Sequence, residues 1–125
     1  MPALAELPSD ALHVAHEAAS VLIRFRDFLP PGGLLVMLAG KFRDDLGEAL
    51  ELEPGERAYR GRDLRSLDEL TSVELDTLDG AVGILLSRFT AYMDDPELAP
   101  LLRNLRGPLA DQKAERAQIR AEIGA

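Results

Sequence analysis

The sequence predicts an all-α fold: a compact bundle of four main helices, the fourth broken near Gly107-Pro108, assembled as a helical homodimer. Apolar side chains recur at alternating steps of three and four through the middle of the chain, the spacing that places them on one helical face. These residues are Leu75, Leu78, Val82, Leu85, Phe89 and Tyr92. Four phenylalanines, two tyrosines and no tryptophan leave a core of leucine, valine, isoleucine and alanine, which favours helices. A chain of 125 residues fits a single domain, 1–125.

The first helix is predicted from Ser9 or Asp10, either of which can cap it, to about Phe28, because two prolines follow. Its apolar face consists of Ala11, Ala15, Ala18, Leu22, Phe25 and Leu29. A second helix is expected from about Gly33 to Leu50. Its first six residues after the glycines, LLVMLA, are apolar on every side, so this helix offers more apolar surface than a single neighbour covers.

Residues 51–65 are polar and aperiodic and are expected to form the main internal loop. Two overlapping capping boxes follow, Ser66 with Glu69 and Thr71 with Glu74, and they predict a short turn before the third helix. The third helix runs from about 72 to 93 and is expected to be the hub of the fold. Its second face holds small residues beside larger apolar ones and would let another backbone approach closely; its members are Val73, Gly80, Ile84, Ser87 and Ala91.

The fourth helix is predicted to begin at Asp94 or Asp95, with Pro96 in the first turn. Gly107-Pro108 predicts a break, after which 109–125 form a C-terminal helix. That segment is rich in helix formers but poor in large apolar residues, so alone it would be marginally stable in water. We therefore expect it at a dimer interface, through Ala110, Ala114, Ala117, Ile119, Ala121 and Ile123.

Composition excludes several functional classes. A formal charge of −8 argues against free-standing nucleic-acid binding, which requires a basic field. The absence of cysteine excludes disulfides, thiolate metal sites and cysteine nucleophiles. No apolar run is long enough for a membrane span, and the first residues lack a signal-peptide pattern, so we expect a soluble cytoplasmic protein. Twelve arginines against two lysines favour a GC-rich bacterial genome as the source.

His13, His16 and Glu17 are the candidate metal ligands. They lie on neighbouring positions of the first helix, and neutral imidazole is a common zinc ligand. A structural site needs four ligands and a catalytic site three, however, and the solvent face of this helix supplies no further histidine or cysteine. We therefore predict no metal. No GxSxG, Walker or GxGxxG motif is present, so the sequence predicts neither a catalytic site nor a cofactor.

Two groups of basic residues are candidate binding sites. One lies in the internal loop and combines arginines with an aromatic ring, which suits a protein partner or an anion: Arg57, Tyr59, Arg60, Arg62 and Arg65. The other lies toward the C-terminus, interleaved with acidic residues: Arg103, Arg106, Lys113, Arg116 and Arg120.

These observations favour a non-catalytic protein-interaction or regulatory module that acts through homodimerisation and has a further protein partner. One alternative is a small-ligand-binding bundle or enzyme with a pocket between the second, third and fourth helices. Another is an accessory protein that contacts nucleic acid through the two arginine clusters, although the acidic charge makes nucleic acid an unfavourable partner.

Overall fold

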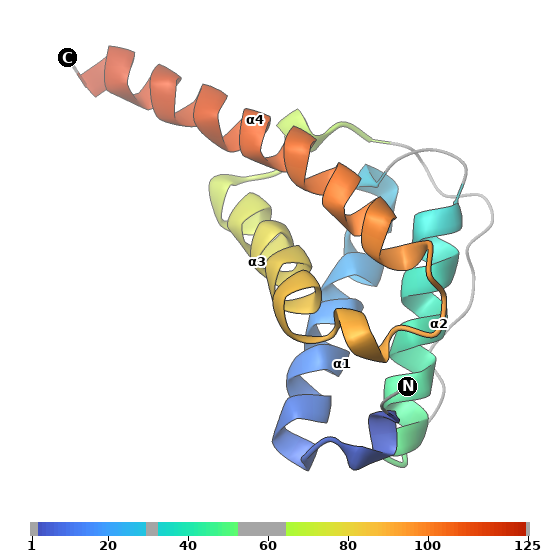
Figure 1. Cartoon of the computed structure of the whole chain (residues 1–125). Coiled ribbons are helices and arrows are strands. Elements are labelled where there is room, and N and C mark those ends of the chain that lie inside the picture. Colours follow the sequence, from blue (N-terminus) through green and yellow to red (C-terminus); the bar gives the residue numbers. More distant parts are fainter. Residues whose placement is uncertain (1–2, 30–32, 53–64, 125) are drawn as a thin grey trace.

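The described residues form four long helices in an all-α arrangement, as the sequence predicts. The computed structural model describes residues 3–29, 33–52 and 65–124, and within these ranges it contains no strand. The long helices are α1 (Ser9–Arg24), α2 (Leu34–Ala49), α3 (Ser72–Arg88) and α4 (Leu98–Gly124) (Figure 1). Short 3₁₀ turns lie before or between them: η1 (Leu4–Glu6), η2 (Arg26–Phe28), η3 (Leu67–Glu69) and η4 (Thr90–Tyr92).

Helix α1 packs against both α2 and α3, so it takes the hub position that we expected for the third helix. Val21 and Ile23 are two positions apart and lie on nearly opposite sides of a helix, yet both are buried. Between these two edges lie three buried alanines, Ala15, Ala18 and Ala19. Their small side chains allow neighbours to approach from two sides. The single apolar face inferred from periodicity is therefore the middle of a wider buried arc.

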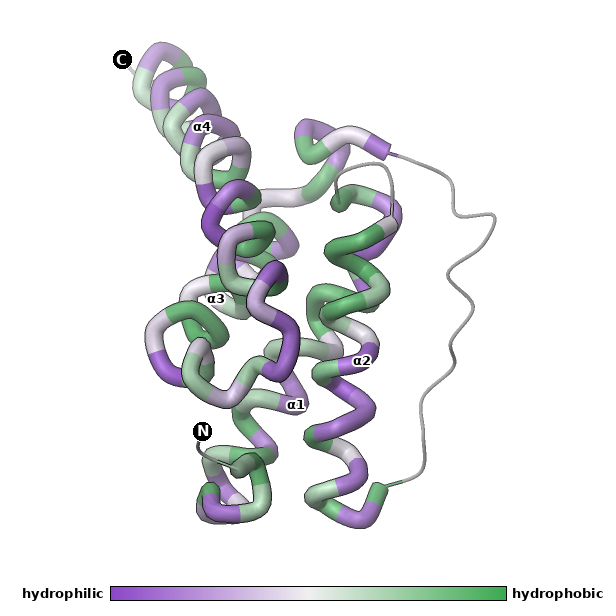
Figure 2. The backbone as a smooth tube through the Cα atoms, turned by 45° about the vertical axis from the view of Figure 1, so that its right-hand side comes forward, coloured by the Kyte–Doolittle hydropathy of each residue, from purple (hydrophilic) through white to green (hydrophobic). Residues whose placement is uncertain are grey.

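Helix α2 runs antiparallel to α1, and Figure 2 shows its first half as hydrophobic and its second half as largely hydrophilic. The first half is apolar all round, but only part of it is covered. Leu35, Val36 and Leu38 are buried, while Leu34 and Met37 remain 41% and 54% exposed.

Both predicted capping boxes form. The backbone N–H of Ser66 donates to Glu69 Oε2 at 2.9 Å, and the N–H of Thr71 donates to Glu74 Oε1 at 3.0 Å. Glu74 N–H donates in return to Thr71 Oγ1 at 3.1 Å, so α3 begins at Ser72 as expected. The helix ends at Arg88, and η4 replaces the last predicted turn. Similarly, α1 ends at Arg24, and η2 occupies the segment up to Phe28.

The predicted break of the fourth helix at Gly107-Pro108 is wrong: α4 continues through Pro108 to Gly124. Proline removes one helical hydrogen bond, here the bond to the carbonyl of Asn104. Gly107 and Pro108 are both exposed, so water can reach that carbonyl. Leu105 and Leu109 are only 2% and 0% exposed, and they anchor the helix to the core on both sides of the proline. This tertiary anchoring outweighs the local preference for a break.

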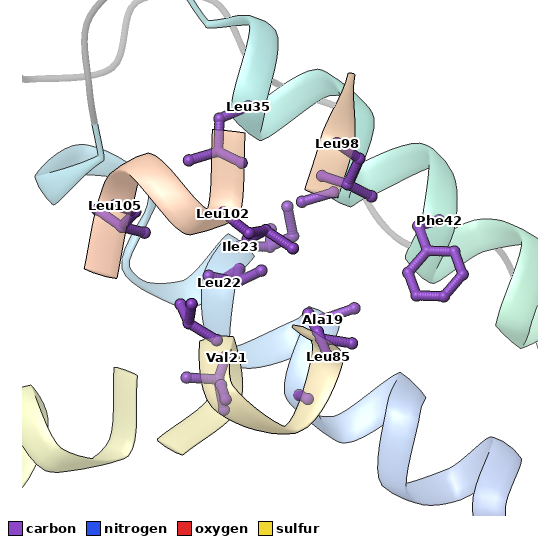
Figure 3. Close-up of a cluster of buried hydrophobic side chains, with 14 of the residues drawn as sticks. Ala19, Val21, Leu22, Ile23, Leu35, Phe42, Leu85, Leu98, Leu102 and Leu105 are labelled. Carbon is purple, nitrogen blue, oxygen red and sulfur yellow. The ribbon is translucent and has the colours of Figure 1, made fainter. Parts of the chain in front are cut away.

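The core lies where side chains from all four long helices meet (Figure 3). The described residues bury no polar or charged side chain, so the interior is held together by apolar burial and packing. The largest fully buried side chains include Leu22 of α1, Leu46 of α2, Leu85 of α3 and Leu102 of α4.

Alanine substitutions of buried side chains at the C-terminal end of α3 test this core. Leu85→Ala and Phe89→Ala should each lower the free energy of unfolding by about 2 to 5 kcal/mol, because each removes buried surface and leaves a cavity. Val73→Ala, on the same helix at 75% exposure, is the control and should change it by less than about 0.5 kcal/mol. Denaturant titration measures all three. Losses below about 1 kcal/mol at Leu85 and Phe89 would contradict this packing.

Candidate functional site

The C-terminal part of α4 projects beyond the other helices (Figure 1). The six residues expected at a dimer interface are all exposed within this single chain: Ala110, Ala114, Ala117, Ile119, Ala121 and Ile123. Ile119 and Ile123 are 48% and 81% exposed. We call residues 110–124 the α4 tail. Its apolar side chains are exposed among the described residues, although Ala117 borders a hollow that Ser72 and Leu75 of α3 also line.

The α4 tail carries two apolar features rather than one. Ala117 and Ile119 are two positions apart, so they lie on nearly opposite sides of the helix. The four alanines share one side and Ile119 and Ile123 share the other. One partner helix cannot cover both sides at once. The six residues predicted as one interface therefore form two separate surfaces.

Ion pairs attach the start of the α4 tail to α3. Lys113 Nζ lies 3.0 Å from Asp79 Oδ2 and 3.2 Å from Asp76 Oδ1. Hydrogen bonds to Asp79 and then to Asp76 raise the pKa of Lys113 above its ordinary value. Arg116 donates to the backbone carbonyl of Asp68 at 3.1 Å. These contacts are exposed and individually weak, but together they set the direction in which the tail leaves the bundle.

An open apolar groove runs between α1 and α3, with a volume of about 480 Å³. Apolar residues and one glycine form its floor and sides: Val14, Ala18, Val21, Gly80, Ala81 and Ile84. Polar residues line its rim: His13, Glu17, Asp76 and Thr77. The α3 side of this groove contains Gly80 and Ile84, two members of the second face that the sequence indicates, and a side chain built at Gly80 would meet no atom within 4 Å. All five members of this second face are exposed, so the described residues do not supply the closely packed backbone that the sequence led us to expect there.

His16 is not on the solvent face of α1, where we expected it. Its ring lies over α2, so that a β-carbon at Gly47 would stand 3.7 Å from His16 Nε2. Burial, followed by the positive charge of Arg43, lowers the pKa of His16 below its ordinary value of 6.5. His13 is exposed and lines the α1/α3 groove. Among the described residues, no group of three or more histidine or acidic side chains is arranged to hold a metal ion.

The basic cluster of the internal loop falls mostly outside the described residues, which exclude Arg57, Tyr59, Arg60 and Arg62. Arg65 is described and contacts its own chain. Its backbone N–H donates to the carbonyl of Asp27 at 2.7 Å, and its guanidinium lies 5.4 Å from the centroid of the Phe28 ring and 3.7 Å from Glu69. Arg65 therefore ties η3 to the end of η2.

Comparisons with protein-family models, with curated protein sequences and with solved structures find no match to this chain. None of the helices in the described ranges has the length and hydropathy required to cross a bilayer.

The position of His16 predicts a pH-dependent stability. A lowered pKa in the folded state means that the unfolded chain takes up the proton first, so acidification below about pH 6.5 favours unfolding. His16→Gln should remove this contribution. Between about pH 7.5 and 5.5, the wild type should lose more unfolding free energy than the variant.

His13→Gln replaces the other histidine and is the comparison variant. Because the charge of His13 lowers the pKa of His16 less than burial and Arg43 do, His13→Gln should reduce the pH dependence less than His16→Gln does. Denaturant titrations at fixed protein concentration across this pH range measure the effect. Identical pH profiles for the wild type and His16→Gln would contradict the assigned environment of His16.

Proposed function

We propose that this protein is a non-catalytic interaction module that works as a homodimer of helical subunits. The observation that carries the proposal is the exposure of the α4 tail, where Ile119 and Ile123 stand in solvent at the end of a continuous helix. An amphipathic helix gains its stability mainly from tertiary packing. Burial of these two side chains by a second chain would supply that packing, at about 25 cal/mol for each Å² of apolar surface removed from water.

The uncovered α1/α3 groove adds a second apolar surface to the same molecule. Monomeric proteins rarely leave large contiguous apolar surfaces exposed, and such surfaces mark sites of association. Uncovered apolar side chains on both the tail and the groove of a chain of this size favour self-association over catalysis. By contrast, the hollow between α2 and the residues that precede α4 measures only about 10 Å³, room for about one water molecule, so it gives little support to a ligand pocket there.

Light scattering tests the proposal. The measured mass of the full chain should be twice 13.6 kDa at high micromolar concentration. A truncation after Arg116 removes residues 117–123, all of which are exposed, and keeps Leu109 and the ion pairs of Lys113. It should therefore abolish the dimer while leaving the monomer folded.

A truncation after Gly107 serves as the contrast. It also removes Leu109, which is fully buried, so it should lower the unfolding free energy by about 2 to 5 kcal/mol as well as prevent association. A full-length chain that stays monomeric at high micromolar concentration would overturn the proposed function.

A further inference from the structure

We infer that the α1/α3 groove of one chain holds the end of the α4 tail of a second copy. The inference rests on the proposed homodimer and specifies which surfaces meet. It names the second copy of this chain, rather than an unrelated partner, as the occupant of the groove.

The docking face of the tail has the spacing used by helices that bind in grooves. Arg116, Ile119, Arg120 and Ile123 follow the pattern i, i+3, i+4 and i+7, which places them on one face of α4. The two arginines also line a hollow against α3 of their own chain, and Arg116 contacts the Asp68 carbonyl, so Ile119 and Ile123 are the exposed part of this face. Helices that lie in apolar grooves present anchors at this spacing. Here the anchors in the middle and at the end are isoleucines, and an arginine lies beside each of them along the same face.

Length favours the same pairing. The eight residues of α4 beyond Arg116 span about 12 Å at the helical rise of 1.5 Å per residue. The α3 wall of the groove, from Asp76 to Ile84, spans about the same distance. The uncovered end of one chain therefore matches the uncovered groove of the other.

Charge discriminates between the groove's candidate occupants. Glu17 and Asp76 lie on opposite rims, and among the described residues that line the groove none is arginine or lysine. Lys113 pairs with Asp76 from α4, whereas none of the described ion pairs involves Glu17. Two grooves packed face to face would bring the Glu17 rims of two chains together, which costs free energy. The tail instead brings Arg120 between the rims. The eight residues beyond Arg116 hold two charged side chains, Arg120 on the docking face and Glu122, which is two positions from it and so lies on nearly the opposite side of the helix.

The floor of the groove suits a helix with branched side chains. Ala18 of α1 and Ala81 of α3 both line the groove as buried small residues, and Gly80 leaves open space on the α3 side. Isoleucine side chains fill such a space, and the small neighbours let the helix axis come close. A two-fold axis would make the exchange reciprocal, with each chain donating a tail and accepting one.

Site-specific disulfide cross-linking tests the arrangement, because the chain contains no cysteine of its own. A tagged Gly80→Cys chain is mixed with an untagged Ile123→Cys or Ile119→Cys chain and oxidised. A disulfide between chains of different mass is necessarily intermolecular, and it requires α-carbons about 4.4 to 6.8 Å apart. We expect a cross-linked heterodimer with at least one of the isoleucine positions.

Ala121→Cys is the matched control, since it lies on the opposite side of the tail and should give no cross-link with Gly80→Cys. A second pair of variants tests the groove by occlusion. Gly80→Phe fills the groove and should shift the protein to monomer. Gly107→Phe, at another glycine with open space around it, should leave the dimer intact.

The outcomes separate the two proposals. A dimer that cross-links Gly80→Cys only to itself, or tail only to tail, or that survives Gly80→Phe, overturns this inference and leaves the proposed homodimer standing. A full-length chain that is monomeric overturns both. Cross-linking to the isoleucine side together with loss of the dimer in Gly80→Phe supports both.

Discussion

The packing of α1 between two neighbours is the constraint on which the rest of the fold depends. Its buried arc extends from Val21, which lines the groove with α3, to Ile23 on the other edge, with Leu22 and three small alanines between them. Because alanine adds little bulk, the neighbouring helices approach α1 closely at the alanine positions. The same small residues leave the α1/α3 contact open at its outer surface. The stability of the core and the presence of the groove thus have a common origin.

Local signals in the sequence were sufficient where a structural feature depends on neighbouring residues. The two capping boxes place η3 and the start of α3 correctly because each is a reciprocal contact over three positions. The periodicity of α3 identifies Leu75, Leu78 and Leu85 as core because one face of this helix is buried. These features need no knowledge of which helices are neighbours.

Features that depend on the partner of a helix could not be predicted in this way. Periodicity placed His16 on the polar side of α1, but Gly47 on α2 leaves room for its ring. Proline chemistry predicted a break in α4, but the buried leucines on either side keep the axis continuous. The groove itself exists only because α1 and α3 are adjacent. The sequence indicated its α3 wall through Gly80 and Ile84 but did not indicate the α1 wall.

Because α4 continues through Pro108 as one helix, a change in its tilt near the bundle moves the whole of the segment beyond. Arg116 still contacts the bundle through the Asp68 carbonyl, and Ile123 lies about 10 Å further along the axis at 1.5 Å per residue. A tilt of about 10° at Arg116 would move Ile123 by about 2 Å at this helical rise. Small rearrangements of the contacts that Lys113 and Arg116 make with α3 and η3 are therefore amplified at the tip. A substitution at Asp79 on α3 would redirect the tip without changing any residue of the tail.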